Sequence, residues 1–291
     1  MTRLDIVLPI DKPEGPTSHD VVAMARSALG IRKIGHTGTL DPFASGLLLL
    51  CVGRATRLAE YLTGLAKSYD AVARLGITTD TEDREGEPSE ECLDWSDLTA
   101  EDVVTAMQEF RGAIDQVPPQ FSAKKVDGVA MHRRARRGEH VELAMRPITV
   151  HELDLRSLEL PFMEFHARCS SGTYVRSLAR DIGEELGVGA HLTGLRRTSI
   201  GAHTLEGAIT PGQLEDPEAV SRAALSPVEA LAHLPTIVVD ESSRDRLAFG
   251  QAITAPDAEE CEHITVVNDG CLVAIAEVRA GALRPKKVFL S

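Results

Sequence analysis

The chain has 291 residues, of which 43% are hydrophobic and 26% charged, a composition typical of a globular protein with one large domain or a large and a small one. Its five cysteines are widely spaced and form no C-x-x-C pair, which argues against a disulfide framework and a cysteine-based zinc site. The net charge of −13 weighs against a nucleic-acid partner, and no apolar run approaches the roughly 18 residues that a membrane span needs.

The negative charge is concentrated in one part of the chain. The range 80–102 contains eleven acidic residues and one arginine, a local net of −10, so the other positions sum to −3. The range 121–150 contains seven basic and three acidic residues, a local net of +4. Because a polyanion responds to charge within a Debye length of about 8–10 Å, nucleic acid stays among the possible partners. The N-terminus lacks a signal-peptide pattern, so we expect a cytoplasmic protein.

The first predicted helix begins after a Pro/Gly-rich turn. Thr17 followed by Asp20 resembles a capping box, and apolar residues at helical spacing continue to Leu29 before Gly30. Glycine commonly ends a helix because it adopts the left-handed conformation without strain. These signals predict a helix between Thr17 and Gly30.

The range 35–46 (GHTGTLDPFASG) is a turn-rich loop that contains a single acid, Asp41. Pro42 fixes its own φ and favours extended geometry in the residue before it, so Asp41 is expected on stiff backbone. Such a loop can present a catalytic carboxylate. An equally good local interpretation is a tight turn in which Asp41 bonds its own backbone.

The range 47–110 predicts alternating strands and helices. We expect, in order, a buried strand at 47–52, a short helix at 54–62, a strand at 67–76, a solvated acidic loop up to residue 91 and a helix at 99–110. The strand at 67–76 begins with Tyr69 in an exposed or site-facing position. Its residues alternate between two faces, as a half-buried strand requires.

The range 116–200 begins with a basic segment at 116–138, whose Val-Pro-Pro sequence excludes a helix interior. Strands are expected at 148–160 and 162–169, followed by a helix that ends at Gly187 and a short basic piece at 191–197. Arg176 falls in the first turn of that helix, where the positive end of the helix dipole disfavours a cation. A carboxylate partner would explain this arginine. Beyond residue 234, short strands punctuated by glycines predict a small β domain.

Several common catalytic motifs are missing. The sequence contains no phosphate-binding G-x-x-x-x-G-K-[ST] or G-x-G-x-x-G loop, no H-E-x-x-H pair and no G-x-S-x-G elbow. These motifs would have indicated nucleotide, zinc or serine-hydrolase chemistry. The remaining candidates are Asp41 in a rigid loop, Tyr69 at a strand start, Arg176 and the basic loops.

The loop at 35–46 resembles the catalytic motif of the tRNA pseudouridine synthase B (TruB) family. Further segments resemble other motifs of this family and occur in the family's order: DKPEGPTS at 11–18, KSY at 67–69 with ARLG at 73–76, QVPPQFSAKKVDG at 116–128, GTYVR at 172–176 and LRRT at 195–198. The resemblance covers about residues 6–201. The C-terminal range resembles a PUA-type RNA-binding module more weakly.

The resemblance implies an α+β fold, with a mixed, largely antiparallel sheet flanked by helices and a small C-terminal PUA-like β domain. It places the catalytic domain at 1–233, with an RNA-gripping insertion at about 117–147, and the PUA-like domain at 234–291. The implied partner is the T-stem-loop of tRNA. We expect a monomer without membrane contact or an obligatory protein partner.

The TruB family isomerises one uridine in the T-loop of tRNA, position 55, to pseudouridine without a cofactor or metal. The resemblance implies that Asp41 is the nucleophile or base, that Arg176 keeps Asp41 charged and that Tyr69 stacks on the target base. The implied substrate-binding residues are His36 as a wedge in the T-loop, Tyr174 and Leu195 as pocket residues, Lys12 as a brace for the catalytic loop, and Arg133 and Arg137 in the basic insertion.

Other interpretations stay open beside this one. Tyr69 could be a half-buried strand residue, Leu195 a core residue and the arginines between Arg133 and Arg137 a solvated face. A tRNA-binding folding chaperone would need the same RNA contacts without catalysis. A guide-RNA-dependent synthase of ribosomal RNA would share the aspartate loop, but there we expect a longer PUA region and basic tails.

Overall fold

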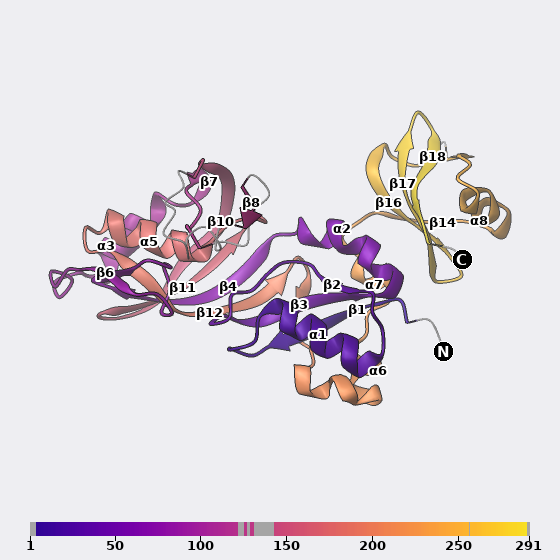
Figure 1. The fold of residues 1–291 in the computed structure, drawn as a ribbon. Coiled ribbons are helices and arrows are strands. Elements are labelled where there is room, and N and C mark those ends of the chain that lie inside the picture. Colours follow the sequence, from indigo (N-terminus) through magenta and orange to yellow (C-terminus); the bar gives the residue numbers. More distant parts are fainter. Residues whose placement is uncertain (1–3, 122–124, 127–128, 131–142, 256, 290–291) are drawn as a thin grey trace.

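The computed structural model describes residues 4–121, 125–126, 129–130, 143–255 and 257–289. Over these ranges the chain forms two larger β-sheets with helices packed against them (Figure 1). This arrangement confirms the α+β class. The main sheet is mixed and largely antiparallel, because among its described strand pairs only β3 and β12 run parallel.

The main sheet has nine strands, seven of them in the spatial order β1-β3-β12-β4-β11-β10-β7, with β2 beside β3 and β13 beside β12. Its strands are β1 (Ile6–Lys12), β2 (Ile34–His36), β3 (Ser45–Val52), β4 (Lys67–Leu75), β7 (Gly112–Gln116), β10 (Arg146–Glu159), β11 (Phe162–Cys169), β12 (Ala190–Ile200) and β13 (His203–Thr204). The three strands β3, β12 and β4 lie side by side although they come from distant parts of the sequence.

Helices cover the two halves of this sheet separately. They are α1 (Ser18–Leu29), the 3-10 helix η1 (Gly53–Leu58), α2 (Ala59–Thr63), α3 (Ala100–Gln108), α5 (Val175–Glu185), the 3-10 helix η2 (Pro211–Glu215), α6 (Pro217–Ala223) and α7 (Pro227–Ala230). One core joins α3 and α5 to β4, β10, β11 and β12, and a second joins α1 and α6 to β1 and β3. Where a single helix was expected at 54–62, the chain forms η1 followed by α2.

Local sequence signals account for the elements on either side of the loop that contains Asp41. Thr17 and Asp20 form the predicted capping box of α1, and Gly30 ends the helix at φ 64°. The apolar run of β3 is continuous because both faces are buried: Leu48 and Leu50 pack in the core with α1, whereas Leu47 and Leu49 pack in the core with η1 and α2. The predicted helix and buried strand are therefore confirmed.

Strand β12 is an element of the main sheet that the sequence did not predict. The range 191–197 looked like a short basic piece, yet β12 pairs with β3 on one side and β4 on the other. Its two arginines made the range look basic, although Leu192 and Leu195 of this strand are buried. The two small hairpins are β5 (Ile77–Thr79) with β6 (Pro88–Glu91), and β8 (Lys125–Val126) with β9 (Val129–Ala130).

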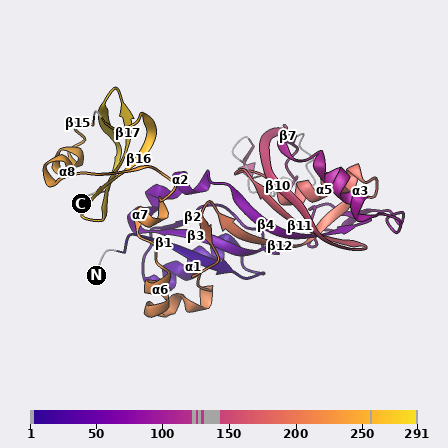
Figure 2. The ribbon, with the colours of Figure 1, turned by 180° about the vertical axis from the view of Figure 1, so that it is seen from behind.

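The C-terminal range folds into a separate five-stranded sheet in the order β14-β16-β17-β18-β15. Its elements are β14 (Thr236–Val238), α8 (Glu241–Ala248), β15 (Ile253–Thr254), β16 (Cys261–Asn268), β17 (Cys271–Arg279) and β18 (Ala282–Val288). The short strands were expected, whereas α8 was not. Figures 1 and 2 show from opposite sides that this sheet lies beside α2, at the end of the molecule away from α3.

Candidate active site

The loop between β2 and β3, which carries Asp41, is fixed by hydrogen bonds from the N-terminal part of the chain. Ser18, the first residue of α1, is fully buried, and its hydroxyl donates to Leu40 O at 3.1 Å and accepts from Leu40 N at 2.8 Å. Gly15 N donates to Pro42 O at 2.8 Å. These bonds hold the residues on both sides of Asp41.

Arg197 on β12 fixes the same loop from the opposite side. Its guanidinium is buried and donates to Leu47 O at 2.7 Å, Gly38 O at 3.1 Å and Thr39 O at 3.4 Å. Gly46 lets β3 lie close to β12, because a Cβ at this position, where φ is +105°, would lie 2.2 Å from Arg197 O. Sequence reasoning missed this arginine, which stands between Arg196 and Thr198 in a segment that looked basic.

Asp41 and Arg176 form the ion pair that the sequence suggested. Arg176 Nε lies 3.0 Å from Asp41 Oδ2, and the Arg176 side chain is only 5% exposed, whereas that of Asp41 is 36% exposed. Burial raises the pKa of Asp41, and the charge of Arg176 acts in the opposite direction. The carboxylate is thus held by a guanidinium in surroundings that weaken its solvation.

A second carboxylate, Asp83, also contacts Arg176. Asp83 Oδ2 lies 3.3 Å from Arg176 Nη1, and the Asp83 side chain is 6% exposed. The same Nη1 donates to Thr81 O at 2.7 Å, and Nη2 donates to Phe121 O at 2.9 Å. Arg176 is therefore held in place by the acidic segment as well as by Asp41.

This arrangement corrects the interpretation of the acidic segment as a solvated loop. Glu82 and Asp83 turn inward, and Glu82 accepts a hydrogen bond from Ser177 Oγ at 2.7 Å and forms an ion pair with Arg180. Both partners belong to α5, two consecutive turns of which face the segment. The high density of acids hid these two residues, since their burial depends on contacts with a helix about 95 positions later.

The loop, β4, β12 and the start of α5 enclose a cavity of about 430 Å³. Five of the predicted site residues line it together: Asp41, Tyr69, Tyr174, Arg176 and Leu195. The remaining lining residues are Gly38, Thr39, Leu40, Thr63, Lys67, Ser171, Gly172, Thr173, Val175 and Arg197. The cavity combines one carboxylate, two aromatic rings and several cations.

Two tyrosines line the cavity wall. Tyr69 is 7% exposed, and burial raises the pKa of its phenol, while Arg197 acts in the opposite direction. Tyr174 is the residue before α5, and the Gln116 amide clamps its backbone by donating to Tyr174 O at 3.0 Å and accepting from Tyr174 N at 2.9 Å. Two aromatic rings beside a carboxylate suit a planar ligand that reacts at its edge.

The other predicted site residues lie apart from the cavity wall. Lys12 is fully buried and donates to Pro13 O at 3.0 Å and Pro16 O at 2.8 Å, which suits a bracing role. His36, at the end of β2, is half-buried and packs edge-on against His19 with ring centroids 5.3 Å apart. The predicted Arg133 and Arg137 lie outside the described residues.

The described residues offer no cluster of three or more histidine, cysteine, aspartate or glutamate side chains suited to hold a metal ion. Every helix in this part of the chain is too short or too polar to cross a lipid bilayer.

Two family models match the chain. The N-terminal domain model of the TruB family pseudouridylate synthases matches residues 26–175, and the C-terminal domain model of tRNA pseudouridylate synthase B matches residues 176–233. Proteins named tRNA pseudouridine synthase B are similar over nearly the whole chain. The one from Cupriavidus metallidurans is 43% identical, covering 99% of this chain and 96% of that protein, and the one from Burkholderia lata is 44% identical, covering 99% and 91%.

Solved structures with the same fold include protein chains from RNA-protein complexes. A chain from a structure described as an H/ACA RNP bound to a substrate RNA containing 2'-deoxyuridine has a TM-score of 0.76 and 26% identity, covering 98% of this chain and 85% of that chain. A chain from the archaeal box H/ACA sRNP Nop10-Cbf5 complex has a TM-score of 0.75 and 27% identity, covering 99% and 87%.

Proposed function

Because the chain belongs to the TruB family of pseudouridylate synthases, we propose that it isomerises the uridine at position 55, in the T-loop of tRNA, to pseudouridine. The observation that carries this proposal is the position of Asp41, which lies in a cavity with Arg176 Nε 3.0 Å from its carboxylate and Tyr69 in the wall. The full-length similarity to proteins named tRNA pseudouridine synthase B supports tRNA as the substrate.

The reaction exchanges one bond to the ribose for another. The N1–C1′ bond breaks, the uracil turns, and a C5–C1′ bond forms; C5 then loses its proton and N1 gains one. Atoms and electrons balance without an oxidant, a reductant or net hydrolysis. Asp41 supplies the nucleophile or base that starts glycosidic cleavage. Arg176 holds its carboxylate in place and favours the charged form.

The cavity wall has to receive a base that has left its stack. Extruding a base from a folded loop costs a few kcal/mol, and stacking on an aromatic side chain returns roughly 1–3 kcal/mol. Tyr69 is placed to supply this stacking, because it is fixed in β4 and faces the cavity that contains Asp41. Tyr174 and Leu195 complete the apolar part of the pocket.

The predicted residues outside the cavity wall have roles at the edge of the site. We assign His36 to the position that the base vacates, where it would wedge into the T-loop. Lys12 braces the turn that precedes the catalytic loop, since its ammonium bonds only main-chain carbonyls among the partners described. Arg133 and Arg137 would grip the RNA backbone. We further propose that 1–233 act as the catalytic domain and 234–291 as a PUA-like domain, in a monomer.

The substitution Asp41→Asn tests the catalytic proposal. It keeps the shape of the side chain but removes the charge, so it should abolish pseudouridine formation while tRNA affinity stays within a few-fold of wild type. Nucleotide-resolved pseudouridine mapping on tRNA treated with purified protein measures the first quantity, and a binding titration measures the second. Conversion of tRNA by this variant would make the assignment of Asp41 wrong.

The similarity to chains of H/ACA complexes favours one second candidate, a synthase that needs a guide RNA and partner proteins. Conversion of an isolated T-stem-loop transcript by the purified chain alone would exclude this requirement. Tight tRNA binding without conversion by the wild type would instead favour a folding chaperone.

A further inference from the structure

Lys67 is a buried lysine in the cavity wall that the proposed reaction does not use. It is the first residue of β4 and lies two positions before Tyr69, so both side chains point to the same face of the sheet. Lys67 is 6% exposed, and its ammonium donates to Thr63 O and Leu65 O, both at 2.9 Å. An ammonium has three N–H donors, so one donor remains after these two bonds.

The positive charge of Lys67 lies close to that of Arg197. A Cβ on Gly38 would lie 3.4 Å from Lys67 Cε and 3.7 Å from Arg197 Nη1, so both side chains approach the same glycine. Burial, followed by the charge of Arg197, lowers the pKa of Lys67 to about 8. The partners described for these two cations are main-chain carbonyls and, for Arg197, the Tyr69 phenol as well; none of them is a carboxylate. Two buried cations without a carboxylate between them favour an anion.

Tyr69 lines the same cavity as this cation pair and Asp41. The charges of Arg197 and Asp41 both act on Tyr69 and on Lys12, and the charge of Arg197 also acts on Lys67. Near the start of α5 the cavity is lined by the uncharged Ser171, Gly172 and Thr173 and by Arg176, whose cation is paired with Asp41. A nucleotide whose base stacks on Tyr69 can thus have its sugar at Asp41 and its negative charge at Lys67.

We propose that the Lys67 ammonium binds a phosphate group of the RNA strand whose base enters the cavity. This inference rests on the proposed function, because it takes the occupant of the cavity to be a nucleotide. The phosphate is the anion that such an occupant brings, and a lysine binds it as a point charge. Arg197 contributes positive charge near Lys67, and its described hydrogen bonds go to carbonyls of the loop and β3 and to Tyr69.

The first test neutralises phosphates one at a time. T-stem-loop RNAs are made with a single methylphosphonate at each linkage from two nucleotides before the target uridine to two after it. Dissociation constants are measured with the full-length Asp41→Asn protein, which leaves the substrate unconverted. One linkage should weaken binding about tenfold, as the loss of a charge-assisted hydrogen bond predicts. If none of the methylphosphonates weakens binding, the inference is wrong, whatever the variants below show.

The second test asks whether Lys67 and that phosphate act together. Lys67→Met, added to Asp41→Asn, should weaken binding of the unmodified RNA about tenfold. Combined with the methylphosphonate at the sensitive linkage, it should weaken binding no further than either change alone, which is the signature of direct coupling. Lys286→Met is the matched control: Lys286 pairs with Glu277 on the C-terminal sheet, so its effect should multiply with that of the methylphosphonate.

Independent effects overturn the inference. If the fold-change in dissociation constant caused by Lys67→Met multiplies with that caused by the methylphosphonate at every linkage, Lys67 binds no phosphate. The thermal unfolding midpoint shows whether the variant is folded, and Lys67→Gln replaces it in the same cycle if methionine lowers the midpoint. The two proposals fail in different ways. A wild-type protein that forms no pseudouridine refutes the proposed function, whereas a protein that forms pseudouridine but shows no coupling refutes only the role of Lys67.

Discussion

Burial moves the pKa of several side chains in the cavity toward values that favour their neutral forms. The carboxyl of Asp41 and the phenol of Tyr69 have raised pKa values, and the ammonium of Lys67 has a lowered one. Such shifts gather at sites where binding free energy or chemistry compensates for the lost solvation. In this cavity the ion pair with Arg176 compensates Asp41 for its lost solvation. The described bonds of Lys67 go to main-chain carbonyls, which carry no opposite charge.

The lowered pKa of Lys67 predicts a pH-dependent difference in stability between the wild type and Lys67→Met. The ordinary value is 10.5 and the folded value about 8, so between these values the unfolded chain binds more protons than the folded one. The free energy of unfolding of the wild type therefore rises with pH in this window and falls as pH drops through 8. At about 1.4 kcal/mol per unit, the difference from Lys67→Met should change by about 3 kcal/mol between pH 7 and 10.5.

Denaturant titrations at several pH values measure this difference. Arg197 and Cys169 face Lys67, and Tyr69 and Asp41 lie in the same cavity. Because both proteins carry these groups, their titration largely cancels in the comparison. The exposed Lys33 provides the control, since Lys33→Met should stay parallel to the wild type. If the plots of unfolding free energy against pH were parallel for the wild type and Lys67→Met, the Lys67 ammonium of the wild type would be solvated in the folded state.

Single elements were predictable where local signals and burial agree. The capping box of α1 and the apolar run of β3 specify their elements directly, and Arg176 was recognised because a cation in the first turn of a helix needs a partner. Its pairing with Asp41 followed from the family resemblance, and the structure supplies the 3.0 Å contact.

Long-range contacts explain what the sequence did not predict. Strand β12 looked basic because Arg196 and Arg197 interrupt its apolar residues, and the reason for Arg197 lies in carbonyls about 150 positions earlier. Glu82 and Asp83 looked solvated because their neighbours are solvated acids. In both cases a charged residue is buried through partners on another element, which hydrophobic periodicity does not register.

The acidic segment between β5 and β6 yields a prediction for catalysis. Asp83→Asn removes one of the two carboxylates that hold Arg176, so Arg176 becomes less well placed for Asp41. Hydrogen bonds to charged groups are worth about 1.5–3 kcal/mol, which corresponds to a rate about tenfold lower or more. Single-turnover pseudouridine formation measures the rate, and a binding titration should show a much smaller loss of tRNA affinity.

The same segment supplies the control for this experiment. Glu87 is an exposed acid four residues further along, and Glu87→Gln makes the same change in net charge. It should leave the rate within about twofold of wild type, as is usual for surface substitutions. Equal effects of the two substitutions would attribute the loss to the field of the whole segment and not to the position of Arg176.

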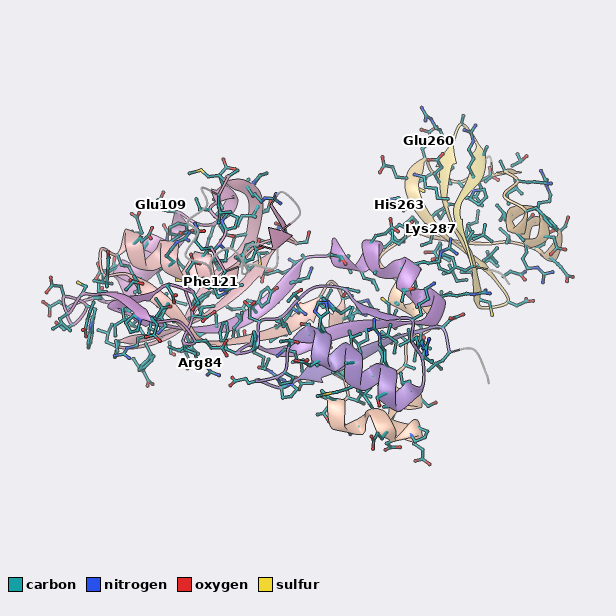
Figure 3. The ribbon with its side chains drawn as sticks, viewed as in Figure 1. Arg84, Glu109, Phe121, Glu260, His263 and Lys287 are labelled. Carbon is teal, nitrogen blue, oxygen red and sulfur yellow. The ribbon has the colours of Figure 1, made fainter. Side chains whose placement is uncertain are left out.

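At the scale of the whole molecule, the C-terminal sheet packs against η1, α2 and α7. Figure 3 shows His263 and Lys287 on the side of this sheet that faces α2. The Tyr61 ring lies 5.1 Å from that of His263, centroid to centroid, and Lys287 forms an ion pair with Glu60. Two residues after Tyr61, Thr63 lines the cavity. The docking surface and the cavity are therefore connected through one short helix.

Charge distribution sets the last prediction, which concerns the basic range 121–150. Replacing Arg133, Arg134, Arg136 and Arg137 together with glutamine should weaken tRNA binding and make it less dependent on salt. Each phosphate that the protein no longer neutralises reduces the steepness of the plot of log affinity against log salt concentration by about 0.7 on single strands and about 0.9 on B-form DNA. Binding titrations between about 50 and 200 mM salt measure this slope.

A second variant with the same net charge distinguishes an effect of local charge on RNA binding from an effect of total charge. Replacing Arg244, Arg246, Arg279 and Arg284 with glutamine removes four positive charges from the C-terminal range 234–291. Because charges beyond a Debye length of about 8–10 Å are screened, this variant should keep a steeper salt dependence than the one in the basic range. An unchanged slope in the first variant would mean that its arginines form a solvated face. Equal flattening in both would mean that the C-terminal sheet contacts RNA as extensively as the basic range, which would give it a direct part in holding tRNA.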